Sequence, residues 1–150
     1  MKLKFPLIAA FVAMLSLSAC GGGSGSSNSN STSTYAITVD PTLKITDNTV
    51  GTGTVAMGGN NATVSYTGWL VDTTKADHKG AQFDAGTGFQ FNVGGHQVIP
   101  GFEQAVYNMK VGGTRTVEIP SKLAYGTAGS PPKIPANSDL VFQITLTAVQ

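Results

Sequence analysis

Among residues 35–150, one stretch has the pattern of an α-helix, and it lies between Val98 and Lys110. Its apolar residues recur at i, i+3, i+4 and i+7, as Phe102, Ala105, Val106 and Met109. Pro100 suits the first turn, where a backbone N–H has no intrahelical partner, and Gly112-Gly113 ends the pattern. The other regular patterns are strand-like. A single helix must bury its apolar face against a sheet, so the sequence predicts an α+β fold.

The strand-like runs alternate apolar and polar residues. Ala62–Val71 is the clearest, and Gly68 within it predicts a bend or a bulge. Similar alternation occurs in Phe89–Val93, Thr114–Ile119 and Leu140–Ala148, with two shorter pieces at Ile37–Val39 and Leu43–Ile45. The segments Asp72–Ala81 and the proline-rich 120–137 are predicted loops, and the Gly-rich segment Ala85–Gly88 precedes the strand predicted for Phe89–Val93. We expect a bent antiparallel sheet of about five strands wrapped around one short helix, with residues 35–150 forming one domain.

The first 34 residues have a different composition. Lys2 and Lys4 precede an apolar run, 7–17, that is too short to span a bilayer, which is typical of a secretory signal peptide over residues 1–19. Residues 17–20, Leu-Ser-Ala-Cys, resemble a bacterial lipoprotein signal, in which the cysteine is acylated. Residues 21–34 contain only Gly, Ser, Asn and Thr, which predicts a flexible linker.

Cys20 is the only cysteine, so an intrachain disulfide is excluded. Its alternative role is that of a buried free thiol. With the lipid interpretation, we expect a domain that is anchored to a membrane of the bacterial cell envelope through Cys20 and faces the periplasm or the exterior.

Several functional classes lack support in the sequence. Without residues 1–19 the chain has seven basic and eight acidic side chains and no basic run, which disfavours nucleic-acid binding. His78 and His96 stand apart from any cluster with metal-ligand spacing. Neither a Gly-x-Ser-x-Gly elbow nor a phosphate-binding loop is present. We therefore expect no metal, no cofactor and no covalent hydrolase chemistry.

Aromatic residues are the notable remaining feature. Each alone is most simply a core residue, but together with their neighbours they form a pattern. The segments Val64–Leu70, Gln82–Asp84, Phe89–Phe91, Gln97–Phe102, Met109–Gly113, Leu123–Gly126, Ile134-Pro135 and Leu140–Phe142 resemble the FKBP-type peptidyl-prolyl cis-trans isomerases in order and spacing, over about residues 50–149. That family has a bent antiparallel sheet wrapped on one helix.

The resemblance implies an apolar pocket for proline-containing polypeptides, which FK506 or rapamycin-type macrolides would also occupy. It implies catalytic roles for Tyr66, Phe83, Asp84, Ile99, Phe102 and Tyr125. It places Phe89, Phe91, Val98, Ile134 and Phe142 in substrate binding. Asp84 and Tyr125 would supply polar groups at the rim, and the Ile99 N–H would bind a substrate carbonyl. The plainer interpretation of Asp84 is an ordinary loop carboxylate.

One departure from the family bears on activity. The pocket floor is Phe102, where the family usually has Trp. This favours an alternative function, a membrane-tethered peptide-binding or chaperone module with little turnover. A third possibility is a surface adhesion domain, which the pocket residues disfavour.

The chain has no large insertion or helical arm, so we expect a monomer. Pro100 restricts Ile99 to extended backbone angles, which would keep the Ile99 N–H out of the helix.

Overall fold

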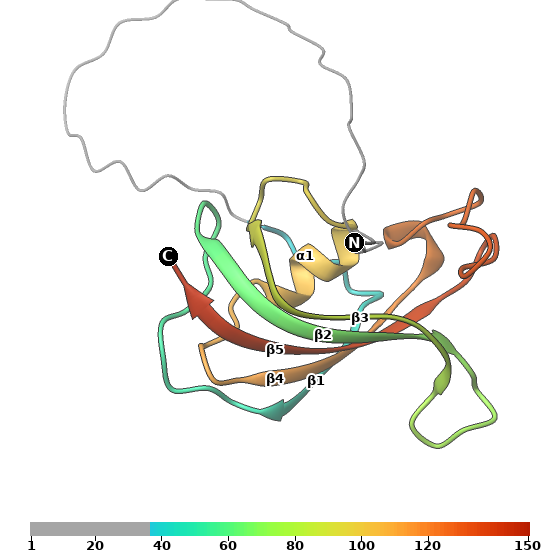
Figure 1. Ribbon diagram of the computed structural model, residues 1–150, viewed down its shortest axis with the longest axis horizontal. Coiled ribbons are helices and arrows are strands. Elements are labelled where there is room, and N and C mark those ends of the chain that lie inside the picture. The colour runs from blue at the N-terminus through green and yellow to red at the C-terminus, as the bar shows by residue number, and fades with distance from the viewer. Residues whose placement is uncertain (1–36) are drawn as a thin grey trace, which may run out of the picture.

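The computed structural model describes residues 37–150, which form one five-stranded antiparallel sheet and one α-helix. In chain order the elements are β1 (Lys44–Thr49), β2 (Asn61–Val71), β3 (Lys79–Asn92), α1 (Pro100–Val106), β4 (Thr114–Ile119), the 3-10 turn η1 (Ser121–Leu123) and β5 (Leu140–Val149). The strands are ordered β1-β4-β5-β2-β3, and the sheet curves around α1 (Figure 1). The predicted fold class is confirmed.

The core lies between α1 and the sheet face that it covers. Phe102, Ala105 and Val106 of α1 have no exposed surface. The alternation predicted for β2, β4 and β5 accounts for the other side of this core, because successive strand residues point to opposite faces. Fully buried residues from these strands include Val64, Val117, Ile119, Leu140, Phe142, Ile144 and Leu146.

The helix is shorter than its apolar pattern. It ends at Val106, because Tyr107 has extended backbone angles (φ −56°, ψ 135°) and Asn108 has a φ of 63°. The Arg115 guanidinium of β4 then binds the Ala105 carbonyl at 2.7 Å and the Tyr107 carbonyl at 3.3 Å. Met109 is still buried, so the apolar period continued past the point at which the helix stopped. The prediction that Gly112-Gly113 ends the helix was wrong.

Three other predictions about strands and loops also need correction. The strand predicted to begin at Phe89 extends back through the Gly-rich segment Ala85–Gly88, because pairing with β2 continues there with a shift in register. The loop predicted for Asp72–Ala81 ends where β3 begins, at Lys79. Ile37–Val39 is not a strand, and β1 begins at Lys44. The predicted irregularity at Gly68 is confirmed by a register shift between Gly68 and Trp69.

The signal peptide, the linker and Cys20 lie outside the described residues. Within residues 37–150, the structure has no helix with the length and apolar character needed to cross a membrane.

Gly68 provides a test of packing between the sheet and the aromatic side chains. A Cβ atom at this position would lie 2.6 Å from Phe83 Cζ and 2.7 Å from Phe142 Cε1. We expect Gly68→Ala to lower the free energy of unfolding by about 1–3 kcal/mol, because both rings are packed and must shift. Denaturant unfolding measures the change. The control Ser65→Ala, on the other face of β2, should change it by less than about 0.5 kcal/mol; equal effects would contradict this account.

Candidate active site

Phe102, in the first turn of α1, is at the centre of an aromatic cluster. Its ring centroid lies 5.7 Å from that of Tyr66, 5.8 Å from that of Phe91 and 5.2 Å from that of Phe142. The interplanar angles of 64–83° correspond to edge-to-face packing, the arrangement that aromatic quadrupoles favour. Phe102 and Phe142 are completely buried. The floor predicted from the sequence is therefore a closed and packed layer of rings.

Further rings extend the cluster toward the surface. Phe83 contacts Phe142 with a centroid distance of 5.5 Å. Phe89 stacks on Phe91 at 6.0 Å and meets Tyr66 edge-on at 5.9 Å, and it is only partly buried. Strands β2, β3 and β5 together with α1 thus bring residues from four parts of the chain to one place.

A polar group lies beside these rings. The Tyr66 hydroxyl donates to Asp84 Oδ2 at 2.9 Å, and the Ala85 N–H donates to Asp84 Oδ1 at 3.0 Å. Burial, and then the hydrogen bond and charge of Asp84, raise the pKa of Tyr66 well above its ordinary value. Burial and the Asp84 charge raise the pKa of Tyr125 to about 12. Both tyrosines therefore carry a protonated hydroxyl near the Asp84 carboxylate at neutral pH.

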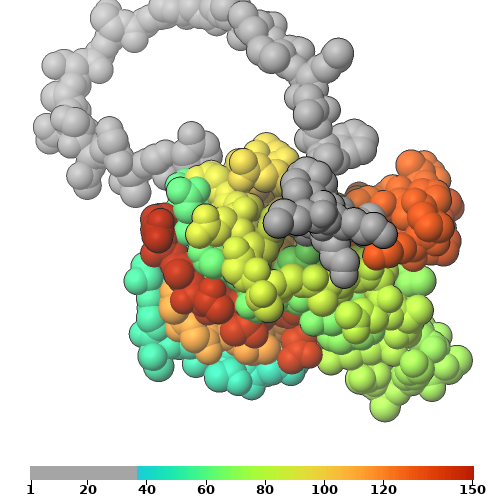
Figure 2. Space-filling model, in the orientation of Figure 1, coloured from blue at the N-terminus to red at the C-terminus, as the bar shows by residue number. Residues whose placement is uncertain are grey.

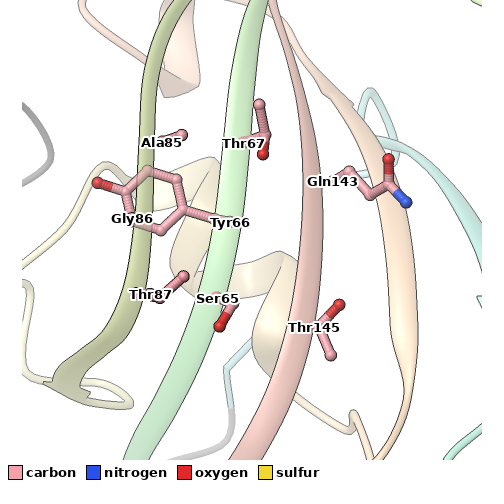
Figure 3. A pocket seen from close by; sticks show the side chains of 8 residues that line it. All are labelled: Ser65, Tyr66, Thr67, Ala85, Gly86, Thr87, Gln143 and Thr145. Carbon is pink, nitrogen blue, oxygen red and sulfur yellow. The ribbon is translucent and has the colours of Figure 1, made fainter.

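Gly86 gives the Tyr66 side chain the room to reach this carboxylate. A Cβ atom at residue 86 would lie 2.9 Å from Tyr66 Cε1. In Figure 3, the Tyr66 ring extends from β2 toward β3, where Gly86 lies. In the Gly-rich part of β3, the backbone of Gly86 thus lies close to the ring of Tyr66, a candidate catalytic residue.

Ile99 provides a backbone donor at the edge of the cluster. Its angles (φ −58°, ψ 142°) are extended, as Pro100 predicted. The Ile99 carbonyl accepts from the N–H groups of Phe102 at 3.0 Å and Glu103 at 3.2 Å, which begin the helix. Within residues 37–150 the Ile99 N–H has no hydrogen-bond partner. A nearly buried, unpaired donor is available for a ligand carbonyl.

Glu103 positions the loop that leads to Ile99, a role that the sequence pattern did not indicate. Its carboxylate is buried, and Oε1 accepts from the N–H of Gly94 at 2.8 Å and of His96 at 3.1 Å. His96 Nδ1 lies 3.4 Å from Oε2. The only available signal was the Gly94-Gly95 turn, whose backbone donors need an acceptor. Glu103 thus joins the β3–α1 loop to the helix.

The proline-rich loop between β4 and β5 lies at another side of the aromatic cluster. Ile134 is fully buried, and its N–H and carbonyl pair with Ser130 at 3.0 and 2.8 Å. The preceding residue, Lys133, donates a hydrogen bond from Nζ to the Phe83 carbonyl at 3.2 Å. In Figure 2 this part of the chain projects as a lobe beyond the sheet. Val98 is also buried in the common core.

The larger of two described hollows lies elsewhere, on the sheet face opposite the core. It has a volume of about 460 Å³ and shares only Tyr66 with the predicted site (Figure 3). Its walls are mainly hydroxyl, amide and backbone groups of β2, β3 and β5, from Ser65, Thr67, Ala85, Gly86, Thr87, Gln143 and Thr145.

Within the described part of the chain, no three His, Cys, Asp or Glu side chains are grouped to hold a metal.

Comparison with known proteins decides the family. The family model for FKBP-type peptidyl-prolyl cis-trans isomerases matches residues 52–147. The chain belongs to this family. FK506-binding protein 1B of Neurospora crassa is 41% identical over 110 residues, which are 71% of this chain and 96% of that protein. The enzyme class predicted from the sequence is confirmed at the level of the family.

Two further relatives extend the comparison. Peptidyl-prolyl cis-trans isomerase FKBP4 of Rattus norvegicus is 46% identical over 64% of this chain, but the match spans only 20% of the rat protein. A crystal structure of a peptidyl-prolyl cis-trans isomerase from Pseudomonas syringae superposes with a TM-score of 0.61 at 33% identity, over 72% of this chain and 75% of that one.

Tyr125 provides a test of the polar group by pH. Because its folded-state pKa is about 12 against an ordinary 10.0, the stability that it contributes is complete below pH 10.0 and is lost as the pH rises toward about 12. Absorbance titration should show one tyrosine of the folded protein ionising near pH 12, and Tyr125→Phe should remove that step. Ionisation of Tyr125 near pH 10.0 in the folded protein would contradict the placement.

Proposed function

We propose that the chain catalyses cis-trans isomerisation of X-Pro bonds in exported polypeptides, without a covalent intermediate. The observation that carries the proposal is the unpaired Ile99 N–H beside the Phe102 cluster, with the Tyr66–Asp84 hydrogen bond on the same cluster. Family membership supports the reaction. The signal-like sequence of residues 1–20 supports the exported substrate.

The mechanism follows from the properties of the amide bond. Twisting an X-Pro amide removes its resonance and its charge-separated character, so apolar surroundings disfavour the planar form relative to the twisted one. The small residual exposure of Phe83, Val98 and Ile99 marks the surface on which the proline ring would lie. The Ile99 N–H would hold a substrate carbonyl. Interactions that strengthen only in the twisted geometry lower the barrier.

The required acceleration is modest. Uncatalysed X-Pro isomerisation takes tens to hundreds of seconds. A turnover of about 10–1000 per second needs a barrier lower by about 4–7 kcal/mol. Apolar burial and a few aligned hydrogen bonds are of this magnitude, so neither a nucleophile nor a metal is required.

A second candidate is a peptide-binding or chaperone module with little turnover. Phe102 favours it, because the ring is completely buried and offers a substrate less aromatic surface than the larger Trp usual at this position. The two candidates differ in turnover and share the binding surface. FK506 or rapamycin-type macrolides would occupy that surface in both, which the name of the Neurospora relative, FK506-binding protein 1B, supports.

Removal of the Asp84 carboxylate tests the site. We expect Asp84→Val to lower kcat/KM for proline isomerisation by about tenfold or more, because a hydrogen bond to a charged group contributes about 1.5–3 kcal/mol. A protease-coupled peptide assay measures kcat/KM, and unfolding measurements check the fold. Asp77→Val, in the exposed β2–β3 loop, is the matched control.

The outcomes separate the candidates. Turnover that is lost in Asp84→Val and retained in Asp77→Val supports the enzyme. A wild-type chain that binds FK506 but does not accelerate isomerisation supports the chaperone. Unchanged turnover in Asp84→Val would show that the catalytic assignment is wrong.

The proposed setting is a monomer that is tied by an acylated Cys20 to a membrane of the cell envelope. Several acyl chains anchor a protein stably where one would not. We expect Cys20→Ser to move the protein from the membrane fraction to the soluble fraction on cell fractionation. Ser18→Ala, within the same signal, serves as the control and should stay with the membrane. A Cys20→Ser protein that remains membrane-bound would place the anchor elsewhere.

A further inference from the structure

Lys133 carries a positive charge at the edge of the aromatic site. Its Nζ donates to the Phe83 carbonyl at 3.2 Å, and the Phe83 side chain packs on Phe142 inside the cluster. An ammonium group has three donors, so two remain after this bond. Within residues 37–150, no carboxylate oxygen lies within 4.0 Å of Lys133 Nζ.

Several cations elsewhere among residues 37–150 have acidic partners, although Lys79 and Lys110 form no ion pair. Lys44 pairs with Glu118 at 2.9 Å, and Arg115 pairs with Asp47 at 2.6 Å. Lys122 Nζ lies 3.3 Å from Asp40. The charge of Lys133 is therefore not neutralised in this way, although it lies beside residues that the proposed function assigns to substrate.

The loop backbone holds this charge in place. Ile134, the next residue, is fully buried and forms two hydrogen bonds with Ser130. The Lys133 side chain is therefore attached to a fixed point of the loop and secured at its tip by the Phe83 carbonyl. A substrate chain that crosses the Phe83 surface passes close to the ammonium group.

We propose that Lys133 is a specificity-determining residue that favours substrates with a carboxylate side chain on a residue flanking the proline. This inference rests on the proposed isomerase function. An incoming Glu or Asp would accept from the free donors of Lys133 and would neutralise its charge. A partly exposed ion pair of this kind changes affinity by about two- to fivefold.

Matched peptides measure the preference. Pairs that differ only as Glu against Gln, at the residue before and at the residue after the proline, are assayed for kcat and KM with the full-length protein. At low salt we expect kcat/KM to be about two- to fivefold higher for Glu at one of these positions, mainly through a lower KM. High salt should reduce this ratio toward one, because screening weakens exposed ion pairs.

Three variants assign the preference to Lys133. Lys133→Gln should bring the Glu/Gln ratio to about one while leaving the rate for the Gln peptide nearly unchanged. Lys133→Glu should reverse the preference. Lys110→Gln, which removes an exposed lysine between α1 and β4, should leave the ratio at its wild-type value.

The outcomes also separate this inference from the function on which it rests. A wild-type protein that accelerates none of the peptides overturns the proposed isomerase. One that accelerates the Gln peptides with a Glu/Gln ratio of one at both positions overturns only the role of Lys133. A ratio that survives Lys133→Gln, or a variant that slows both peptides equally, shows that Lys133 only supports the loop.

Discussion

The packing of Phe102 against the curved sheet is the interaction on which the rest of the structure depends. A helix of seven residues is far too short to be stable alone, so α1 exists because its apolar face is buried. The same contact brings rings of β2, β3 and β5 together and fixes the position of Ile99 at the start of the helix. The hydrophobic core and the candidate site are therefore one structure, and a substitution in the first turn of α1 affects both.

Polar groups tie this short helix to the sheet at both ends. Glu103 accepts backbone donors of the β3–α1 loop at the start of the helix. Arg115 reaches from β4 to the last carbonyls of α1 and also pairs with Asp47 of β1. Arg115 thus satisfies carbonyl groups that the end of α1 leaves without intrahelical partners, whereas Glu103 satisfies N–H groups of the preceding loop. These contacts hold the Ile99 N–H at a set position, which a reaction based on a few aligned donors requires.

The charges near the site are compatible with the proposed isomerisation, in which no proton is transferred. The two tyrosines beside Asp84 have raised pKa values and stay neutral over the physiological range. Asp84 is held by hydrogen bonds at both oxygens. Lys133 adds a cation outside the rings without entering them. The cluster thus remains apolar, while its rim has charges of both signs, as the proposed function and the proposed role of Lys133 require.

Sequence patterns were sufficient for the features that depend on local geometry. The alternation of apolar and polar residues located β2, β4 and β5, because successive side chains of a strand point to opposite faces and only one face is buried. Pro100 determined the extended angles of Ile99 through contact between neighbouring residues. The spacing of the motifs was also enough to identify the family and the aromatic cluster, since each motif lies on a short segment.

Only the tertiary structure decided the features that depend on distant partners. β3 continues through its glycine-rich segment because β2 supplies hydrogen bonds, and α1 stops at Val106 although the apolar period continues to Met109. The contacts of Glu103 with Gly94 and of Lys133 with Phe83 have no periodic signature. A linear pattern records the environment of each residue but not which remote backbone group completes its hydrogen bonds, and pairing across the sheet and loops makes that choice.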